Sequence, residues 1–78
     1  MLTIYSKDDC PMCESAIRLC KMRSIEHTVK KLNQDFTQDE LLSMTDQRAR
    51  SYPQIFQVCV YVGGFVDFQK ALASGSIN

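Results

Sequence analysis

The feature that most constrains the fold is a pair of cysteines, Cys10 and Cys13, at the start of a predicted helix. They follow a short β-prone run at residues 2–5 and a polar stretch at residues 6–9. Pro11 suits the first position of a helix, where its missing N–H leaves no hydrogen bond unmade. After it, apolar side chains recur at helical spacing, at Cys13, Ala16, Ile17 and Cys20. The pair therefore lies where a buried strand passes into an amphipathic helix.

Two further regions are typical of strands. Residues 25–32 mix β-branched side chains with charge, and their two consecutive lysines suit the edge of a sheet. Residues 54–62 are dense in Ile, Phe, Val and Tyr, which predicts one or two strands that end at Gly63-Gly64. Asp67 is a good N-cap for a last helix, with Gly75 as its stop.

A capped helix is predicted between these regions. Thr37 and Glu40 have the spacing of a capping box. Phe36 and Leu41 are placed for the hydrophobic staple around it. The end of this helix, near residues 47–49, is poorly marked. The side chains expected to point inward are Leu41, Leu42 and Met44.

The predicted order of elements is therefore β-α-β-α-β-β-α. An opening β-α-β unit implies a parallel pair of strands with a right-handed crossover, and the later adjacent strands imply an antiparallel hairpin. We expect one α/β domain over residues 1–78, because a chain of 78 residues has no room for a second core.

Charge and hydropathy exclude several function classes. Nine basic and nine acidic side chains give a formal net charge of +0, so nothing suggests a partner such as nucleic acid or a membrane surface. No apolar run approaches the roughly 20 residues of a membrane span. The N-terminus lacks the pattern of a signal peptide, so we expect a cytoplasmic protein, in a compartment where most thiols are kept reduced.

The two cysteines of the pair are expected to have different roles. As the predicted N-cap, Cys10 faces unpaired backbone N–H groups and the positive end of the helix dipole, both of which favour the thiolate. Lys7 adds positive charge, which Asp8 and Asp9 partly offset. The thiolate is the attacking species in thiol–disulfide exchange. Cys10 is therefore the predicted nucleophile, and the more buried Cys13, one turn later, is the predicted resolving thiol.

Other uses of four cysteines fit less well. A structural zinc site needs a second cysteine pair at similar spacing, and only the isolated Cys20, Cys59 and His27 remain. A secreted scaffold with two disulfides conflicts with the missing signal peptide and with the close spacing of the pair. We predict no metal site, and we expect Cys20 and Cys59 to be small buried core residues.

Three motifs, in this order and spacing, resemble the glutaredoxin family. The first is Ile4-Tyr5-Ser6-Lys7 followed by Cys10-Pro11-Met12-Cys13, where the family typically carries Cys-Pro-Tyr-Cys. The second, Arg50-Ser51-Tyr52-Pro53-Gln54-Ile55-Phe56, is similar to the segment around the family's cis-proline. The third, Gly63-Gly64-Phe65-Val66-Asp67, is similar to its Gly-Gly-x-x-Asp turn. The resemblance spans almost the whole chain. It implies a thioredoxin-like fold, in which three helices flank a four-stranded mixed sheet.

The resemblance also implies a glutathione site. Lys7 and Arg50 would face the glycine carboxylate of glutathione. Tyr52, just before a cis Pro53, would offer its backbone N–H and C=O to the cysteinyl unit, as an added strand does.

The same resemblance places the other end of glutathione at the last motif. Val66 and Asp67 would hold the γ-glutamyl group, through backbone N–H groups and the carboxylate. Three departures from the family stand out. Met12 replaces the usual tyrosine of the substrate site, Tyr52 is bulkier than the usual residue, and residues 57–60 contain no turn residue.

The activity implied is that of a glutathione-dependent thiol–disulfide oxidoreductase, which reduces protein disulfides and glutathione mixed disulfides. Glutathione would be a co-substrate, with no tightly bound cofactor, and the protein would act as a monomer. Other expected partners are disulfide-containing or glutathionylated proteins, such as ribonucleotide reductase. Two alternatives stay open. One is a redoxin served by thioredoxin reductase, although its usual C-terminal Trp-Ser-Gly-Phe-Arg-Pro-like segment is absent; the other is an iron–sulfur carrier, which Pro11 disfavours.

Overall fold

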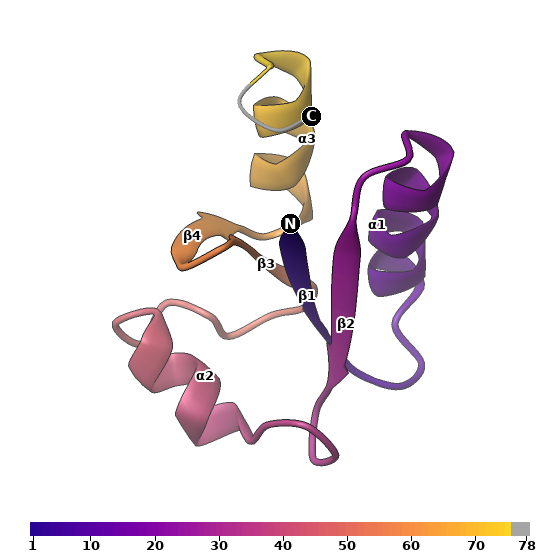
Figure 1. Ribbon diagram of the computed structural model, residues 1–78. Helices are drawn as coiled ribbons and strands as arrows, with labels where there is room; N and C mark the ends of the chain where they lie inside the picture. The colour runs from indigo at the N-terminus through magenta and orange to yellow at the C-terminus, as the bar shows by residue number, and fades with distance from the viewer. Residues whose placement is uncertain (76–78) are drawn as a thin grey trace.

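Over residues 1–75, the chain folds into four strands and three helices in the predicted order. The computed structural model describes these residues, and residues 76–78 lie outside the described part. The elements labelled in Figure 1 are β1 (Leu2–Ser6), α1 (Pro11–Met22), β2 (His27–Lys31), α2 (Gln38–Met44), β3 (Gln54–Gln57), β4 (Val60–Gly63) and α3 (Phe65–Ala73). The predicted α/β succession is confirmed.

The four strands form one mixed sheet in the order β2-β1-β3-β4. β1 pairs in parallel with β2, with Leu2 opposite His27. β1 also pairs antiparallel with β3, which sets Leu2 opposite Gln57. β3 and β4 form the predicted antiparallel hairpin. The four-stranded mixed sheet is confirmed, and β2 lies at its edge, as the charge in this strand indicated.

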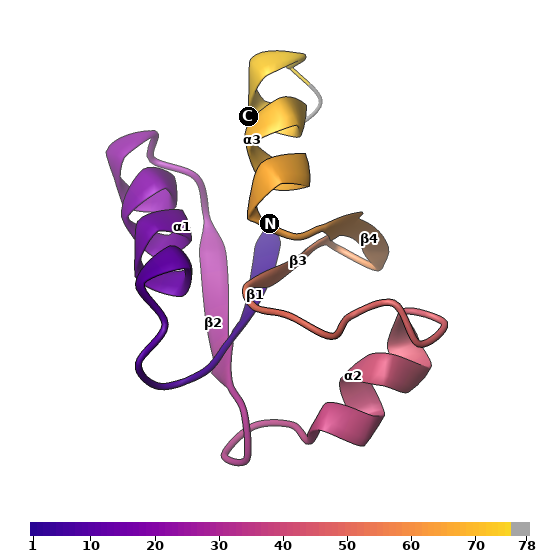
Figure 2. The same cartoon turned by 180° about the vertical axis from the view of Figure 1, so that it is seen from behind.

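The sheet carries a core on each of its faces, because neighbouring residues of a strand point to opposite sides. Ile4 and Ile55 belong to a cluster that α1 and α3 cover. Tyr5 and Phe56 belong to a second cluster, which contains Leu41 of α2. Figure 1 and, from behind, Figure 2 show α2 apart from the other two helices. No helix among residues 1–75 is long and apolar enough to cross a membrane.

The start of α2 is as predicted, but its end is not. Thr37 and Glu40 form the reciprocal hydrogen bonds of a capping box. The helix ends at Met44, earlier than expected, because the Thr45 hydroxyl donates to the Leu41 carbonyl and the next two residues have positive φ. Met44, expected to point inward, is instead exposed.

The N-cap predicted for the last helix is wrong. Gly64 is the N-cap of α3 and makes no side-chain hydrogen bond, whereas Asp67 lies within the first turn. The helix starts earlier because Gly63, at a φ of 128°, turns the chain directly out of β4. Asp67 still lies near the positive end of the helix dipole, where a carboxylate is stabilising. Gly75, at a φ of 78°, follows the end of the helix as expected.

The β3–β4 hairpin turns without a glycine. Val58 and Cys59 form the turn, and Val58 has a φ of 57°, in the left-handed region that a β-branched residue rarely adopts. This turn carries Cys59 out of the core. The expectation that Cys59 is buried is therefore wrong, whereas Cys20 is fully buried as expected.

We predict that Val58→Asn stabilises the protein by about 1 kcal/mol, because asparagine tolerates the left-handed conformation and the exposed valine loses little packing. For a domain of this size, thermal unfolding should shift upward by about 4–8 °C. Val60→Asn is the matched control, because Val60 is equally exposed but has no positive φ. A gain in both variants, or in neither, would contradict the explanation.

Candidate active site

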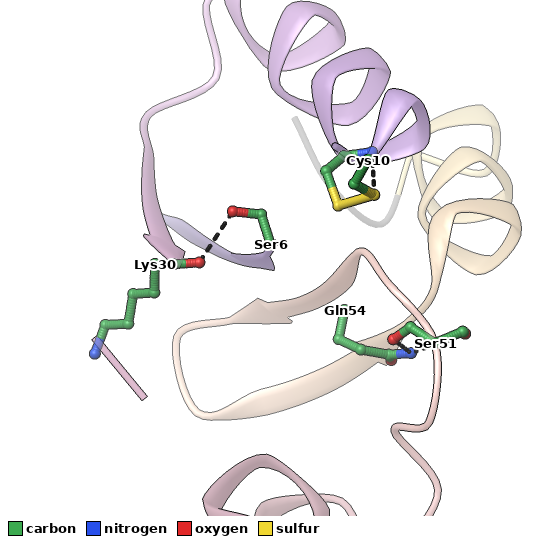
Figure 3. Close-up of a disulfide and its surroundings, with 6 residues drawn as sticks. Ser6, Cys10, Lys30, Ser51 and Gln54 are labelled. Atoms are coloured by element: carbon green, nitrogen blue, oxygen red, sulfur yellow. Dashed lines mark hydrogen bonds between the residues drawn. A yellow bond between two sulfur atoms is a disulfide. The ribbon is translucent and has the colours of Figure 1, made fainter. Parts of the chain in front are cut away.

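Cys10 and Cys13 form a disulfide at the start of α1. Figure 3 shows this disulfide with Ser6, Ser51 and Gln54 around it. The sulfur of Cys10 accepts a hydrogen bond from the backbone N–H of Cys13, with 3.2 Å between the two atoms. Cys10 is 8% exposed and Cys13 2%. The cysteine predicted to attack is thus the more accessible of the two.

The local sequence accounts for the position of Cys10. The residue has extended backbone as the N-cap, and its carbonyl accepts the first helical hydrogen bond, from the N–H of Glu14 at 3.1 Å. Pro11 at the first helical position supplies a fixed φ suited to this start. The remaining N–H groups of the first turn have no carbonyl partner within the helix, so they and the dipole present positive charge to the sulfur.

Lys7 lies near the loop that precedes β3. Its ammonium is 5.7 Å from the centre of the Tyr52 ring, a cation–π distance. Asp8, which was expected to offset Lys7, forms an exposed ion pair with Lys31, with 3.1 Å between nitrogen and oxygen. Lys7 and Tyr52, predicted from separate segments, are therefore brought together.

The other two segments predicted for the site also meet. The peptide bond between Tyr52 and Pro53 is cis, as expected, and Pro53 is buried. A Cβ added to Gly64 would lie 3.6 Å from the carbonyl oxygen of Pro53, so the start of α3 lies against this loop. A Cβ on Gly63 would meet Asp67, which places that carboxylate over the glycine turn.

Three of the predicted site residues do not take part in these contacts between segments. Met12, Arg50 and Val66 are exposed. Within residues 1–75, the guanidinium of Arg50 has no hydrogen bond or ion pair, so it is free to meet a ligand. Two residues around the loop, Gln38 and Gln54, were not predicted as site residues, because the motifs give no role to a glutamine that bonds to the loop backbone.

The remaining cysteines do not extend this site. Burial raises the pKa of the Cys20 thiol, which keeps it protonated and unreactive. Cys59 is exposed at the hairpin turn. No group of three or more His, Cys, Asp or Glu side chains among the described residues is arranged to hold a metal ion.

Known proteins are similar to this chain in both sequence and fold. A protein-family model described as glutaredoxin matches residues 2–64. A glutaredoxin of Neisseria meningitidis is 30% identical, over 99% of this chain and 91% of its own length. The structure of reduced Escherichia coli glutaredoxin has a TM-score of 0.83 at 20% identity, covering 96% of this chain and 95% of that one. A buckwheat glutaredoxin–glutathione complex has a TM-score of 0.81 at 24% identity, covering 95% and 69%.

A mixed sheet with a cysteine pair at the start of its first helix and a cis-proline before β3 defines a thiol–disulfide oxidoreductase of thioredoxin-like fold. The family model covers most of the chain, and the Neisseria relative is 30% identical over 99% of this chain. The chain belongs to the glutaredoxin family.

Proposed function

We propose that the protein uses glutathione to reduce protein disulfides and glutathione mixed disulfides. The observation that carries this proposal is the position of Cys10, at the positive end of α1 and near the loop of the cis-proline. Membership of a family that uses glutathione supports the choice of reductant. So does the buckwheat protein of the same fold, which has been solved with glutathione.

The proposed reaction is a pair of thiol–disulfide exchanges. The Cys10 thiolate attacks one sulfur of the substrate disulfide, and the other substrate sulfur leaves as a thiolate. The Cys13 thiolate then attacks the Cys10 sulfur, which closes the Cys10–Cys13 disulfide and releases the first substrate sulfur. Two glutathione molecules supply two electrons to restore the dithiol, and they leave as glutathione disulfide.

The charges of glutathione match the proposed site. Lys7 and Arg50 would bind the glycine carboxylate by charge-assisted hydrogen bonds. The backbone of Tyr52 would pair with the cysteinyl unit. The N–H of Val66 would bind the γ-glutamyl carboxylate, and Asp67 would bind the ammonium.

Two further residues would shape the substrate surface. Pro53 would set the direction of the Tyr52 backbone, and Met12 would present an apolar side chain beside the nucleophile. The protein substrates would be disulfide-containing or glutathionylated proteins, with ribonucleotide reductase among them. We place the protein in the cytoplasm, as a monomer of one domain over residues 1–78.

A coupled assay with two electron sources tests this function. NADPH oxidation is followed with a small disulfide substrate, either through glutathione and glutathione reductase or through thioredoxin reductase alone. We expect turnover that saturates with glutathione. Turnover with thioredoxin reductase and none with glutathione would instead identify the reductase-served redoxin.

Arg50→Ala tests the glutathione site. We predict that the KM for glutathione rises about five- to thirtyfold with little change in kcat, because the variant loses one exposed charge-assisted contact of about 1–2 kcal/mol. Arg18→Ala, on the exposed side of α1, is the matched control and should leave both constants unchanged. If Arg50→Ala behaves like the control at low salt, Arg50 is a solvated charge outside the site.

A further inference from the structure

We propose that Gln38 and Gln54 are positioning residues, whose side-chain amides fix residues 49–53 in the conformation that binds glutathione. The inference rests on the proposed function, since it concerns how the glutathione loop is held. Gln38 lies outside the motifs that predicted the site, and Gln54 lies within the second motif but was given no role there. Gln38 starts α2 and Gln54 starts β3, so the loop is held from two separate elements.

Gln54 fixes the loop from the side of the sheet. It is only 3% exposed, and its amide nitrogen lies 2.8 Å from the carbonyl oxygen of Ser51 and 3.4 Å from the Ser51 hydroxyl. Figure 3 shows this amide turned back onto Ser51. Its oxygen accepts from the hydroxyl of Tyr61 on β4. The amide therefore links the loop to the edge strand of the sheet.

Gln38 fixes the loop from the side of α2. Its amide nitrogen donates to the carbonyl oxygen of Ala49 at 3.0 Å, and its oxygen accepts from the hydroxyl of Tyr52. In the chain, Arg50 lies between Ala49 and Tyr52, the two residues that Gln38 contacts. Tyr52 is the residue whose backbone would bind the cysteinyl unit. Gln38 therefore restrains both the Arg50 contact and the Tyr52 contact that are proposed for glutathione.

Each glutamine can make both of its contacts because a side-chain amide carries a donor nitrogen and an acceptor oxygen at the same end. Burial raises the pKa of Tyr52 and of Tyr61, so both phenols stay protonated and donate near neutral pH. The amide nitrogens are then left for the two loop carbonyls. Among the described residues, the Ala49 carbonyl accepts from Gln38 and the Ser51 carbonyl from Gln54, and neither carbonyl has another donor, so losing either amide nitrogen would leave a loop carbonyl without its partner.

The Tyr61 contact connects this network to a further cation. The Arg48 guanidinium lies 5.0 Å from the centre of the Tyr61 ring, and its Nε donates to the Thr45 carbonyl oxygen at 3.0 Å. Arg48 thus packs on Tyr61 of β4, the tyrosine that donates to Gln54, whereas the guanidinium of Arg50 stays free. This division explains why, of two neighbouring arginines, only Arg50 is available to a carboxylate.

Gln38→Glu and Gln54→Glu test the inference, because each keeps the acceptor for the tyrosine and replaces the donor with an oxygen that repels the loop carbonyl. We expect the KM for glutathione to rise about tenfold in each, with kcat within about twofold. Gln57→Glu, at the other end of β3, is the matched control. Alkylation of reduced Cys10 by iodoacetamide should keep its wild-type rate. That measurement uses a Cys59→Ser background, because Cys59 is an exposed free thiol.

The possible outcomes separate this inference from the proposed function. A raised KM with unchanged kcat and alkylation supports the positioning role. If wild-type turnover saturates with glutathione and both variants keep the wild-type KM, the positioning role alone is overturned. A raised KM together with a matching fall in kcat and in the alkylation rate would show a general structural role, and would overturn the positioning role as well. If wild-type protein shows no dependence on glutathione, the proposed function fails and the inference fails with it. Gln38 is half-buried, so its variant should fold even if Gln54→Glu does not.

Discussion

Replacing Cys10 with serine should abolish every exchange reaction, whereas replacing Cys13 should remove only part of the activity. A serine hydroxyl is not ionised near neutral pH, so Cys10→Ser has no nucleophile, and we expect a loss of more than about a thousandfold. In Cys13→Ser the nucleophile and its helix N-terminus remain. Glutathione itself can resolve a mixed disulfide on Cys10, so reduction of glutathione mixed disulfides should persist.

The two activities must be measured separately in each variant. A glutathionylated peptide reports reduction of mixed disulfides, and an intramolecular protein disulfide reports the reaction that needs the Cys13 thiol. Cys59→Ser is a suitable control for cysteine content, because Cys59 is an exposed free thiol outside the site. Equal loss of both activities in Cys13→Ser would show that Cys13 does more than resolve. Retained activity in Cys10→Ser would reverse the two roles.

Local sequence signals predicted most of the fold, because these elements are marked by their own residues. The capping box of α2 needs only two side chains three residues apart, and it forms as expected. The helical stripe of α1 depends only on spacing, and its inward members Cys13, Ala16 and Cys20 are buried. The end of α2 was missed because it depends on Thr45 bonding back to Leu41, which no stop residue signals.

The site was harder to predict, because its parts meet only through the fold. The motifs identified Lys7 and Tyr52 as site residues. The cation–π contact between these two side chains, however, depends on how the end of β1 and the loop before β3 lie together. Gln38 and Gln54 were not predicted as site residues, since glutamine is common on surfaces and its bonds to the loop backbone leave no recognisable pattern in the sequence. Cys59 was misplaced because a two-residue turn headed by a valine with positive φ is rare.

The two positions of the Gly63-Gly64 motif have different structural requirements, so an added side chain should have a large effect at only one of them. Gly63 has a φ of 128°, and a Cβ there would clash with Oδ2 of Asp67 and lie 2.8 Å from Cβ of the same residue. The carboxylate can rotate away, but the Asp67 Cβ is fixed to the backbone of α3. Gly64 has an ordinary φ, and its added Cβ would meet only the Pro53 carbonyl oxygen, at 3.6 Å.

Gly63→Ala should therefore destabilise the protein by about 3 kcal/mol, the sum of backbone strain and overpacking. Gly64→Ala should cost only about 0.5–1 kcal/mol, because alanine is a poorer N-cap than glycine but meets no clash there. In thermal unfolding, the first variant should melt more than about 10 °C below wild type. Below that midpoint, its KM for glutathione should also rise, because relief of the clash moves Asp67 away from the proposed ammonium site. Similar melting of the two alanine variants would show that the turn tolerates a side chain at Gly63. A lowered melting temperature with an unchanged KM would instead separate Asp67 from glutathione binding, and leave the glycine with a purely conformational role.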